Sequence, residues 1–322
     1  RAGARGAEAD RVTPPPSTTT RRHRRRRHHR GKPRGEESEE PLLELADFTY
    51  ADPHDSRMRR LAIRGIERVT GKPRLARLYR QHLAAHDPDF WGSSIRRLGV
   101  ELDYDADKLE RLPAEGPAVV VANHPYGVLD GLMIGHLVGR RRKDFRIVAH
   151  GLLTRSAEAA PFLLPIDFAD TDTARHTNLR SRKGALDWLK GGGVLIVFPG
   201  GTVSTSPKAF GPAVDPPWKP FTAKLIHAAR APVLPVCFVG QNSRLFQLAS
   251  HVSLTLRMSL LFHEVANKIG SRQRIEIGDL IPYAELAPLK ERAALMTELR
   301  HRVYDLHPTP KLADRSFTLR VA

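Results

Sequence analysis

Residues 119–131 have the sequence VVVANHPYGVLDG, in which an apolar run stops at Asn123-His124 and a Pro-Tyr-Gly turn leads to Asp130. Short runs rich in β-branched residues and bounded by Gly, Pro or Asn are typical of buried strands. The run at 118–124 is one of four separated by helical patterns, and the others are DFRIVAH at 144–150, VLIVFPGG at 194–201 and PVLPVCFVG at 232–240. This alternation predicts an α/β fold with a mostly parallel sheet flanked by helices.

The composition restricts the partners and the compartment. The 322 residues are 41% hydrophobic and carry a formal net charge of +17, which favours nucleic acid, acidic proteins or anionic lipid headgroups. The single cysteine, Cys237, lies in an apolar run, which excludes disulfides and a cysteine metal site and fits a reducing, cytosolic compartment. Because no run approaches the ~20 apolar residues of a membrane-spanning helix and no signal peptide is present, we expect a protein that lies on a membrane without crossing it.

The composition also divides the chain into four parts. Residues 1–42 are rich in Arg, Pro and Thr and are expected to form a disordered basic tail. The tail has no aromatic residues between its arginines, which argues against nucleic acid as a partner. Residues 43–100 are expected to form N-terminal helices that associate with a membrane, 101–310 the α/β domain, and 311–322 a C-terminal tail.

Two amphipathic stretches bear on membrane association. In residues 55–71, Asp55 or Ser56 suits a helix N-cap and Gly71 a stop, and arginines flank an apolar face of Met58, Leu61, Ala62, Ile66 and Val69. Such a helix either rests in a bilayer interface or packs on the core, and the sequence leaves both open. In residues 244–260, Leu245, Leu248, Val252, Leu256 and Leu260 recur at helical spacing, as in a helix that dips into the bilayer, lines an acyl channel or belongs to the core.

His124 and Asp130 have the residue types of a general-base pair. Ligands of α/β folds gather at the carboxyl ends of strands, where His124 is expected, and the helix that follows would direct its first N–H groups there. A histidine whose tautomer is fixed by a carboxylate can deprotonate an alcohol. Because the chain has no Gly-x-Ser-x-Gly elbow, the pair suits direct attack by a substrate hydroxyl rather than hydrolysis. The alternative is a strand-end histidine beside a helix cap.

A second loop follows the apolar run at 194–197. Gly200 and Gly201 leave backbone N–H groups open, and Thr202 and Ser204 supply hydroxyls, so the loop suits a phosphate or an oxyanion. A tight turn is the alternative. The spacing of the remaining histidines suggests no metal site.

These two features, taken together, resemble the glycerolipid acyltransferases, the family that includes the lysophosphatidic acid acyltransferases. In that family an Asn-His motif with a downstream Asp supplies the catalytic pair, and a Phe-Pro-Glu-Gly loop helps to hold the acceptor phosphate. Here NHPYGVLDG corresponds to the first and FPGGTVS to the second, while LLPIDF at 163–168 and APVLPVCFVG at 231–240 fall where two further family blocks lie. The resemblance covers roughly residues 100–285, about three-fifths of the chain.

Three departures modify what the resemblance implies. Five residues separate His124 from Asp130 where the family usually has four, Gly200 replaces an acidic residue, and Phe168 replaces a phosphate-binding arginine. The His-Pro-x-Gly-x-x-Asp-Gly pattern is similar to a hemolysin-like or aminolipid-forming branch, whose acceptors would carry a carboxylate or sulfonate. Arg180 and Arg244 are then candidates for binding that acidic group.

The resemblance therefore implies an O-acyltransferase that transfers a fatty acyl group from acyl-CoA or acyl-carrier protein to the hydroxyl of a lysophospholipid or lyso-aminolipid. It implies His124 and Asp130 as the catalytic pair, and Asn123, Gly200, Gly201, Thr202 and Ser204 as substrate-binding residues. No metal or bound cofactor is expected, and the expected location is the cytoplasmic face of the cell membrane, peripherally bound. The rival hypothesis is a non-catalytic lipid- or nucleic-acid-binding protein on the same fold.

Overall fold

The computed structural model of the chain describes residues 49, 56–69, 71–85, 87–167, 169, 171–208 and 211–315. The expected tail at 1–42, Asp55 and Phe168 lie outside these residues, as does most of the segment 311–322. The described residues belong to one compact unit.

The unit contains helices and strands in an order that alternates through its central part. The strands are β1 Glu101–Asp103, β2 Ala118–Ala122, β3 Phe145–His150, β4 Leu163–Ile166, β5 Val194–Val197, β6 Val233–Val239 and β7 Arg272–Ile277. The α-helices are α1 Arg57–Val69, α2 Lys72–Ala85, α3 Phe90–Leu98, α4 Ala106–Leu109, α5 Val128–Arg141, α6 Asp172–Lys190, α7 Phe221–Ala229, α8 Arg244–Val252, α9 Leu254–Ser259, α10 Leu261–Asn267, α11 Tyr283–Leu286 and α12 Arg292–Tyr304. Two 3-10 helices, η2 Gly151–Arg155 and η3 Ala160–Phe162, connect β3 to β4.

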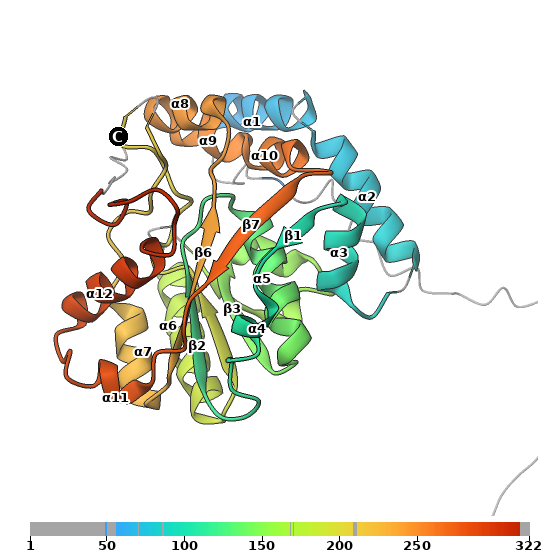
Figure 1. The fold of residues 1–322 in the computed structure, drawn as a ribbon. Coiled ribbons are helices and arrows are strands. Elements are labelled where there is room, and N and C mark those ends of the chain that lie inside the picture. Colours follow the sequence, from blue (N-terminus) through green and yellow to red (C-terminus); the bar gives the residue numbers. More distant parts are fainter. Residues whose placement is uncertain are drawn as a thin grey trace, which may run out of the picture. The chain divides into compact units, whose positions relative to one another are not determined.

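The strands form one seven-stranded sheet in the order β1-β7-β6-β2-β5-β3-β4. The five strands from β6 to β4 run parallel, β7 pairs antiparallel with β6, and β1 pairs parallel with β7. The predicted mostly parallel sheet flanked by helices is confirmed (Figure 1). β2 lies between β5 and β6, so its carboxyl end faces the loops that follow both neighbours.

Two apolar layers cover the central strands from opposite faces. Val120 of β2 packs in the layer that contains α3 and α5, while Val119 and Val121 pack in the layer that contains α6, α7 and α12. Successive side chains of a strand point to opposite faces, and every residue of β2 is buried. The unbroken valine run is therefore the pattern of a strand covered by helices on both sides.

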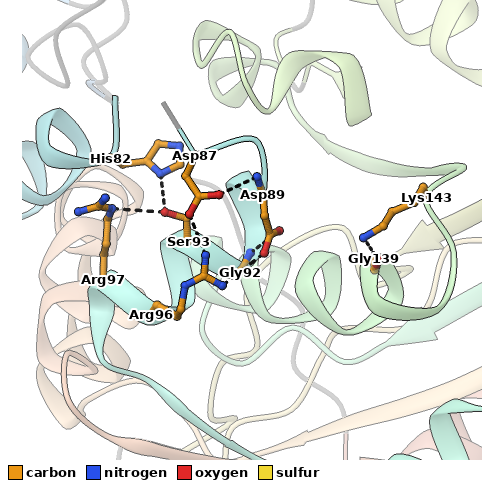
Figure 2. Close-up of polar contacts among 9 residues, drawn as sticks. All are labelled: His82, Asp87, Asp89, Gly92, Ser93, Arg96, Arg97, Gly139 and Lys143. Carbon is orange, nitrogen blue, oxygen red and sulfur yellow. Dashed lines mark hydrogen bonds and ion pairs between the residues drawn. The ribbon is translucent and has the colours of Figure 1, made fainter. Parts of the chain in front are cut away.

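Local polar contacts fix α3 beside α2. The Asp89 carboxylate accepts the Gly92 backbone N–H at 3.0 Å and so caps α3, and it also pairs with Arg96 (Figure 2). Nδ1 of His82, on α2, lies 3.0 Å from the Ser93 hydroxyl. Burial lowers the pKa of His82, which favours the neutral ring.

The stretch 244–260 is not one continuous helix. It divides at Ser253, whose extended backbone ends α8 and whose hydroxyl accepts an N–H of α9. Ser favours such caps because its side chain competes with the helix backbone for N–H groups. Consequently Leu245, Leu248 and Val252 are exposed on α8, whereas Leu260 is buried.

The amphipathic helix α1 follows Ser56, whose hydroxyl accepts the Arg59 N–H as expected of an N-cap. Its buried residues are Ile63 and Glu67, whereas Met58, Leu61 and Val69 of the predicted apolar face are exposed. α1 contacts α9, and Ile66 packs with the cluster that includes Phe246 of α8 (Figure 1). Within the described ranges, no helix combines the length and the apolar character needed to cross a membrane.

Candidate active site

His124 is fixed at the carboxyl end of the central strand. Asn123, which is buried, continues the pairing of β2 with β6, because its Nδ2 donates to the Phe238 carbonyl at 3.0 Å and its Oδ1 accepts the Phe238 N–H at 2.7 Å. An asparagine can replace a backbone pair in this way because its amide carries both a donor and an acceptor. Asn123 therefore holds the strand end rather than presenting its side chain to solvent.

The turn after His124 brings the chain back toward the histidine. Oδ2 of Asp130, the third residue of α5, accepts the backbone N–H groups of Tyr126 at 2.8 Å and Gly127 at 2.9 Å. Gly127 has a φ of +78°, and a Cβ there would lie 3.2 Å from Val203, so the turn requires glycine. Asp130 thus caps the first turn of its own helix and is fully buried.

The same carboxylate lies against the histidine ring. Nδ1 of His124 is 3.0 Å from Oδ2 of Asp130, although the two atoms are not joined by a hydrogen bond in this arrangement. The five intervening residues therefore still bring the two side chains within reach. Burial raises the pKa of Asp130, and the contact with His124 and the two backbone N–H groups oppose that shift. Oδ1 of Asp130 is buried and has no hydrogen-bond partner among the described residues.

The other side of the imidazole is partly open. The ring of His124 stacks on Phe198, the residue after β5, with ring centroids 4.2 Å apart and an interplanar angle of 29°. Its side chain is 19% exposed. With Nδ1 turned toward Asp130, Nε2 is the nitrogen available to a substrate.

The glycine loop after β5 packs directly on His124. The Ser204 N–H donates to the His124 carbonyl at 2.8 Å, and the Ser204 hydroxyl donates to Oδ1 of Asp215 at 2.5 Å. Ser204 is buried, so its hydroxyl is engaged inside the protein, while Thr202 is exposed. A Cβ at Gly201, which has a φ of +72°, would lie 2.9 Å from Nζ of Lys219, so that ammonium lies beside the loop.

The structure adds Asp215, which the sequence did not single out. It lies in the run AVDPPW, between the glycine loop and α7, and matches no motif that carries chemistry. A Cβ at Gly200 would lie 3.1 Å from Cβ of Asp215, so the absence of a side chain at position 200 makes room for this acid. The sequence signal was therefore indirect: a glycine where the resemblance predicts a carboxylate.

The two arginines proposed for anion binding both lie on the surface. Arg180 is exposed on α6, and Arg244 is exposed at the first position of α8.

Among the described residues, no three His, Cys, Asp or Glu side chains are grouped as metal ligands would be. Cys237 is buried in β6, and burial raises the pKa of its thiol.

The chain is similar to a protein family, to two curated proteins and to a solved structure. Residues 51–308 match the model of a family described as Acyltransferase. The chain is 26% identical over 254 residues to the lyso-glycine lipid O-acyltransferase of Phocaeicola vulgatus. The matched region covers 73% of this chain and 88% of that protein. It is 27% identical over 213 residues to the protein of the same name from Bacteroides thetaiotaomicron, and this match covers 62% of this chain and 73% of that protein. Among solved structures, it is similar to the 1-acyl-sn-glycerophosphate acyltransferase PlsC from Thermotoga maritima, with 16% sequence identity and a TM-score of 0.44. The superposition covers 86% of this chain and 97% of that chain.

Proposed function

This chain belongs to the acyltransferase family, and we propose from that premise that it transfers a fatty acyl group to the hydroxyl of a lysolipid, with His124 as general base and Asp130 as its partner. The observation that carries the proposal is the 3.0 Å contact between Nδ1 of His124 and Oδ2 of Asp130 at the carboxyl end of the central strand. This contact leaves Nε2 as the basic atom on the open side of the ring.

The proposed reaction balances without a covalent enzyme intermediate. Nε2 of His124 takes the proton of the acceptor hydroxyl as its oxygen attacks the thioester carbonyl. The carbon–sulfur bond then breaks, and the imidazolium returns the proton to the leaving thiolate. Asp130 stabilises the imidazolium that forms in between, which requires the ring to turn slightly so that Nδ1–H points at Oδ2. Catalytic hydrogen bonds are often poorly aligned before substrate binds.

For the acceptor, we propose a lyso-aminolipid whose headgroup carries an acid, with a lysophospholipid as the alternative. Support comes from the two relatives, both of which are named for O-acyl transfer to lyso-glycine lipid. The ammonium of Lys219 lies beside Gly201 and the exposed Thr202, where positive charge suits an anionic headgroup. Arg180 and Arg244 are proposed as further contacts to that headgroup or to neighbouring lipids.

For the donor, we propose a fatty acyl thioester carried by coenzyme A or by acyl-carrier protein. Both present the same kind of carbonyl to the attacking hydroxyl, so the chemistry at His124 is the same for either. The reaction as proposed needs no metal or bound cofactor, because acid–base chemistry at one histidine serves both proton transfers.

The direct test is acyl transfer by the purified chain. Radiolabelled palmitoyl-CoA and palmitoyl-carrier protein are each supplied with a lyso-glycine lipid, a lyso-ornithine lipid or lysophosphatidic acid, and the products are separated by thin-layer chromatography. We expect turnover with an aminolipid acceptor to exceed that with lysophosphatidic acid at least tenfold. Absence of transfer to all three acceptors from both donors would contradict the proposed function.

We further propose that the protein binds the surface of the cytoplasmic membrane leaflet through α1 and α8. The six large exposed apolar side chains on α1 and α8 are Met58, Leu61, Val69, Leu245, Leu248 and Val252, and they define the membrane face. α1 also carries Arg57, Arg59, Arg64 and Arg68, all exposed, which suit anionic headgroups around the apolar side chains. Since α8 follows β6, this face lies at the edge of the sheet where His124 lies.

Replacing Leu61 and Val252 together by aspartate should weaken binding to anionic vesicles. Each substitution removes the ~1.5–3 kcal/mol gained by burying an aliphatic side chain in the membrane, and each aspartate is repelled by the anionic headgroups. We therefore expect at least a tenfold loss of affinity for the vesicles. Sedimentation with vesicles of phosphatidylglycerol and phosphatidylethanolamine measures it. Leu179→Asp is the matched control, because Leu179 is 60% exposed but lies on α6. Equal loss in the control would contradict a specific membrane face.

A further inference from the structure

Asp215 is a buried acid that the proposed reaction does not use. Its residue is 0% exposed, yet its backbone and side chain make contacts to several separate segments. Main-chain contacts fix it from one side: its N–H donates to the Tyr304 hydroxyl at 2.7 Å, and its carbonyl accepts from Arg300 at 3.2 Å. Both partners belong to α12, which packs on the sheet.

From this anchored backbone, the carboxylate is directed at the candidate active site. Oδ1 accepts the backbone N–H of His124 at 3.1 Å together with the Ser204 hydroxyl, and Oδ2 accepts the indole N–H of Trp218 at 2.9 Å. One oxygen thus joins the strand end that carries the histidine to the loop that carries the glycines.

The loop that Asp215 contacts is held from its other side as well. Arg257, which is 3% exposed, donates to the Val203 carbonyl at 2.5 Å and to the Thr205 hydroxyl. Burial lowers the pKa of Arg257 to about 10. The segment Val203–Thr205 therefore lies between a buried cation and a buried acid. Ser204 joins it to His124 directly through its N–H, and indirectly through its hydroxyl, which donates to the Asp215 oxygen that also accepts the His124 N–H.

We infer that Asp215 is a positioning residue for acyl transfer, which fixes the backbone of His124 and the glycine loop in one geometry. The inference rests on the proposed function for its effect on rate. Asp215 acts through other residues, because it is fully buried and bonds to the main chain of His124 rather than to the ring. A small displacement of a general base from the proton that it removes can reduce the rate on the order of 100-fold.

Glu264 provides a matched control elsewhere in the fold. Its carboxylate, 1% exposed, also accepts the backbone N–H and the hydroxyl of a single serine, Ser243, at 2.8 and 2.6 Å. It holds Ser243, the N-cap of α8, and its two hydrogen bonds go to Ser243 rather than to His124 or the glycine loop. Asp215→Ala and Glu264→Ala therefore remove the same kind of buried acceptor, and only the first removes one that holds the histidine.

The test compares steady-state kinetics of these variants with the wild-type chain, at a temperature well below each melting transition. We expect Asp215→Ala to lower kcat on the order of 100-fold while both KM values change less than about threefold, and Glu264→Ala to keep kcat within about twofold. Asp215→Asn, which retains one oxygen acceptor, should recover part of the loss. Equal losses at positions 215 and 264, or an unchanged kcat in Asp215→Ala, would overturn the inference.

Two measurements keep the inference testable if Asp215→Ala misfolds or if no acceptor is turned over. Ser204→Ala removes only the hydroxyl bond to Asp215, and its kcat should fall about tenfold. Amide hydrogen exchange needs no substrate: residues 123–127 should exchange at least tenfold faster in Asp215→Asn or Asp215→Ala, and at the wild-type rate in Glu264→Ala. Unchanged exchange at 123–127 overturns the positioning role even if the proposed function holds, whereas faster exchange in a chain without transferase activity rejects the proposed function alone.

Discussion

His124→Ala should lower acyl transfer by 10²- to 10⁴-fold in an assay that the wild-type chain supports. That range is the usual contribution of a positioned general base. The substitution removes Nε2, the ring nitrogen on the side of the imidazole away from Asp130. The loss should fall on kcat, because the acceptor and the donor still meet the glycine loop and the membrane face. A discontinuous radiometric assay with excess enzyme extends to such low rates.

The control for this variant is His227→Ala. His227 is a half-buried histidine of α7 that bonds to the Leu289 carbonyl at 3.1 Å, and it lies toward the end of α7, just before β6 begins. It is therefore at the opposite edge of the sheet from His124. We expect its activity to stay within about twofold of wild type. If His124→Ala folds normally and keeps full activity, the general-base assignment is wrong.

The position of His124 could be predicted because it follows from local pattern and sheet geometry. A valine run buried on both faces indicates a central parallel strand, and the carboxyl ends of adjacent parallel strands meet at one edge. β2 and β5 are indeed neighbours, with Val121 opposite Val197, so the residues after each strand come together. This is why His124 and Phe198 stack although they are 74 positions apart in the sequence (198 − 124).

What could not be predicted depends on contacts distant in sequence. The pairing of Asn123 with Phe238 spans 115 residues, and the bond from the His124 N–H to Asp215 spans 91 residues. Neither pair belongs to a motif that the sequence shows. The interruption at Ser253 depends on a cap that competes with an otherwise regular apolar period. Helical spacing identified the apolar face of α1, but only packing shows that Ile63 and Glu67 face inward and leave Met58 and Leu61 exposed.

Asp130→Asn should combine a large loss of activity with a gain in stability. An amide retains an oxygen that can accept the Tyr126 and Gly127 N–H groups, so the turn is preserved, but it cannot stabilise an imidazolium or select the required tautomer. We expect kcat to fall on the order of 10²- to 10⁴-fold. Thermal unfolding followed by circular dichroism should show a higher Tm than wild type at neutral pH.

The stability gain follows from the direction of the pKa shift. Burial raises the pKa of Asp130 in the folded state above its unfolded value, so its favourable contribution is present in full below the unfolded pKa and is lost as the pH rises through the folded pKa. At neutral pH, which is above the unfolded pKa, burying this acid therefore costs stability that a neutral amide in the same place does not cost. The Tm difference between Asp130→Asn and wild type should consequently be larger at pH 7.5 than at pH 4.

Asp144→Asn is a control of opposite sign. Asp144, the residue before β3, accepts two hydrogen bonds of 2.6 and 2.7 Å from Arg142, and these bonds lower its pKa. Its contribution to stability is present above its unfolded pKa and is lost as the pH falls through the folded pKa. Asp144→Asn should therefore lower the Tm at pH 7.5 and lower it less at pH 4. The activity of this variant should stay unchanged. Opposite Tm shifts in the two variants, with activity lost in one, would show that burying a charge at Asp130 serves the reaction at the expense of the fold. A lower Tm in Asp130→Asn at neutral pH would instead mean that the ionised carboxylate stabilises this turn, and that the pKa of Asp130 is not raised.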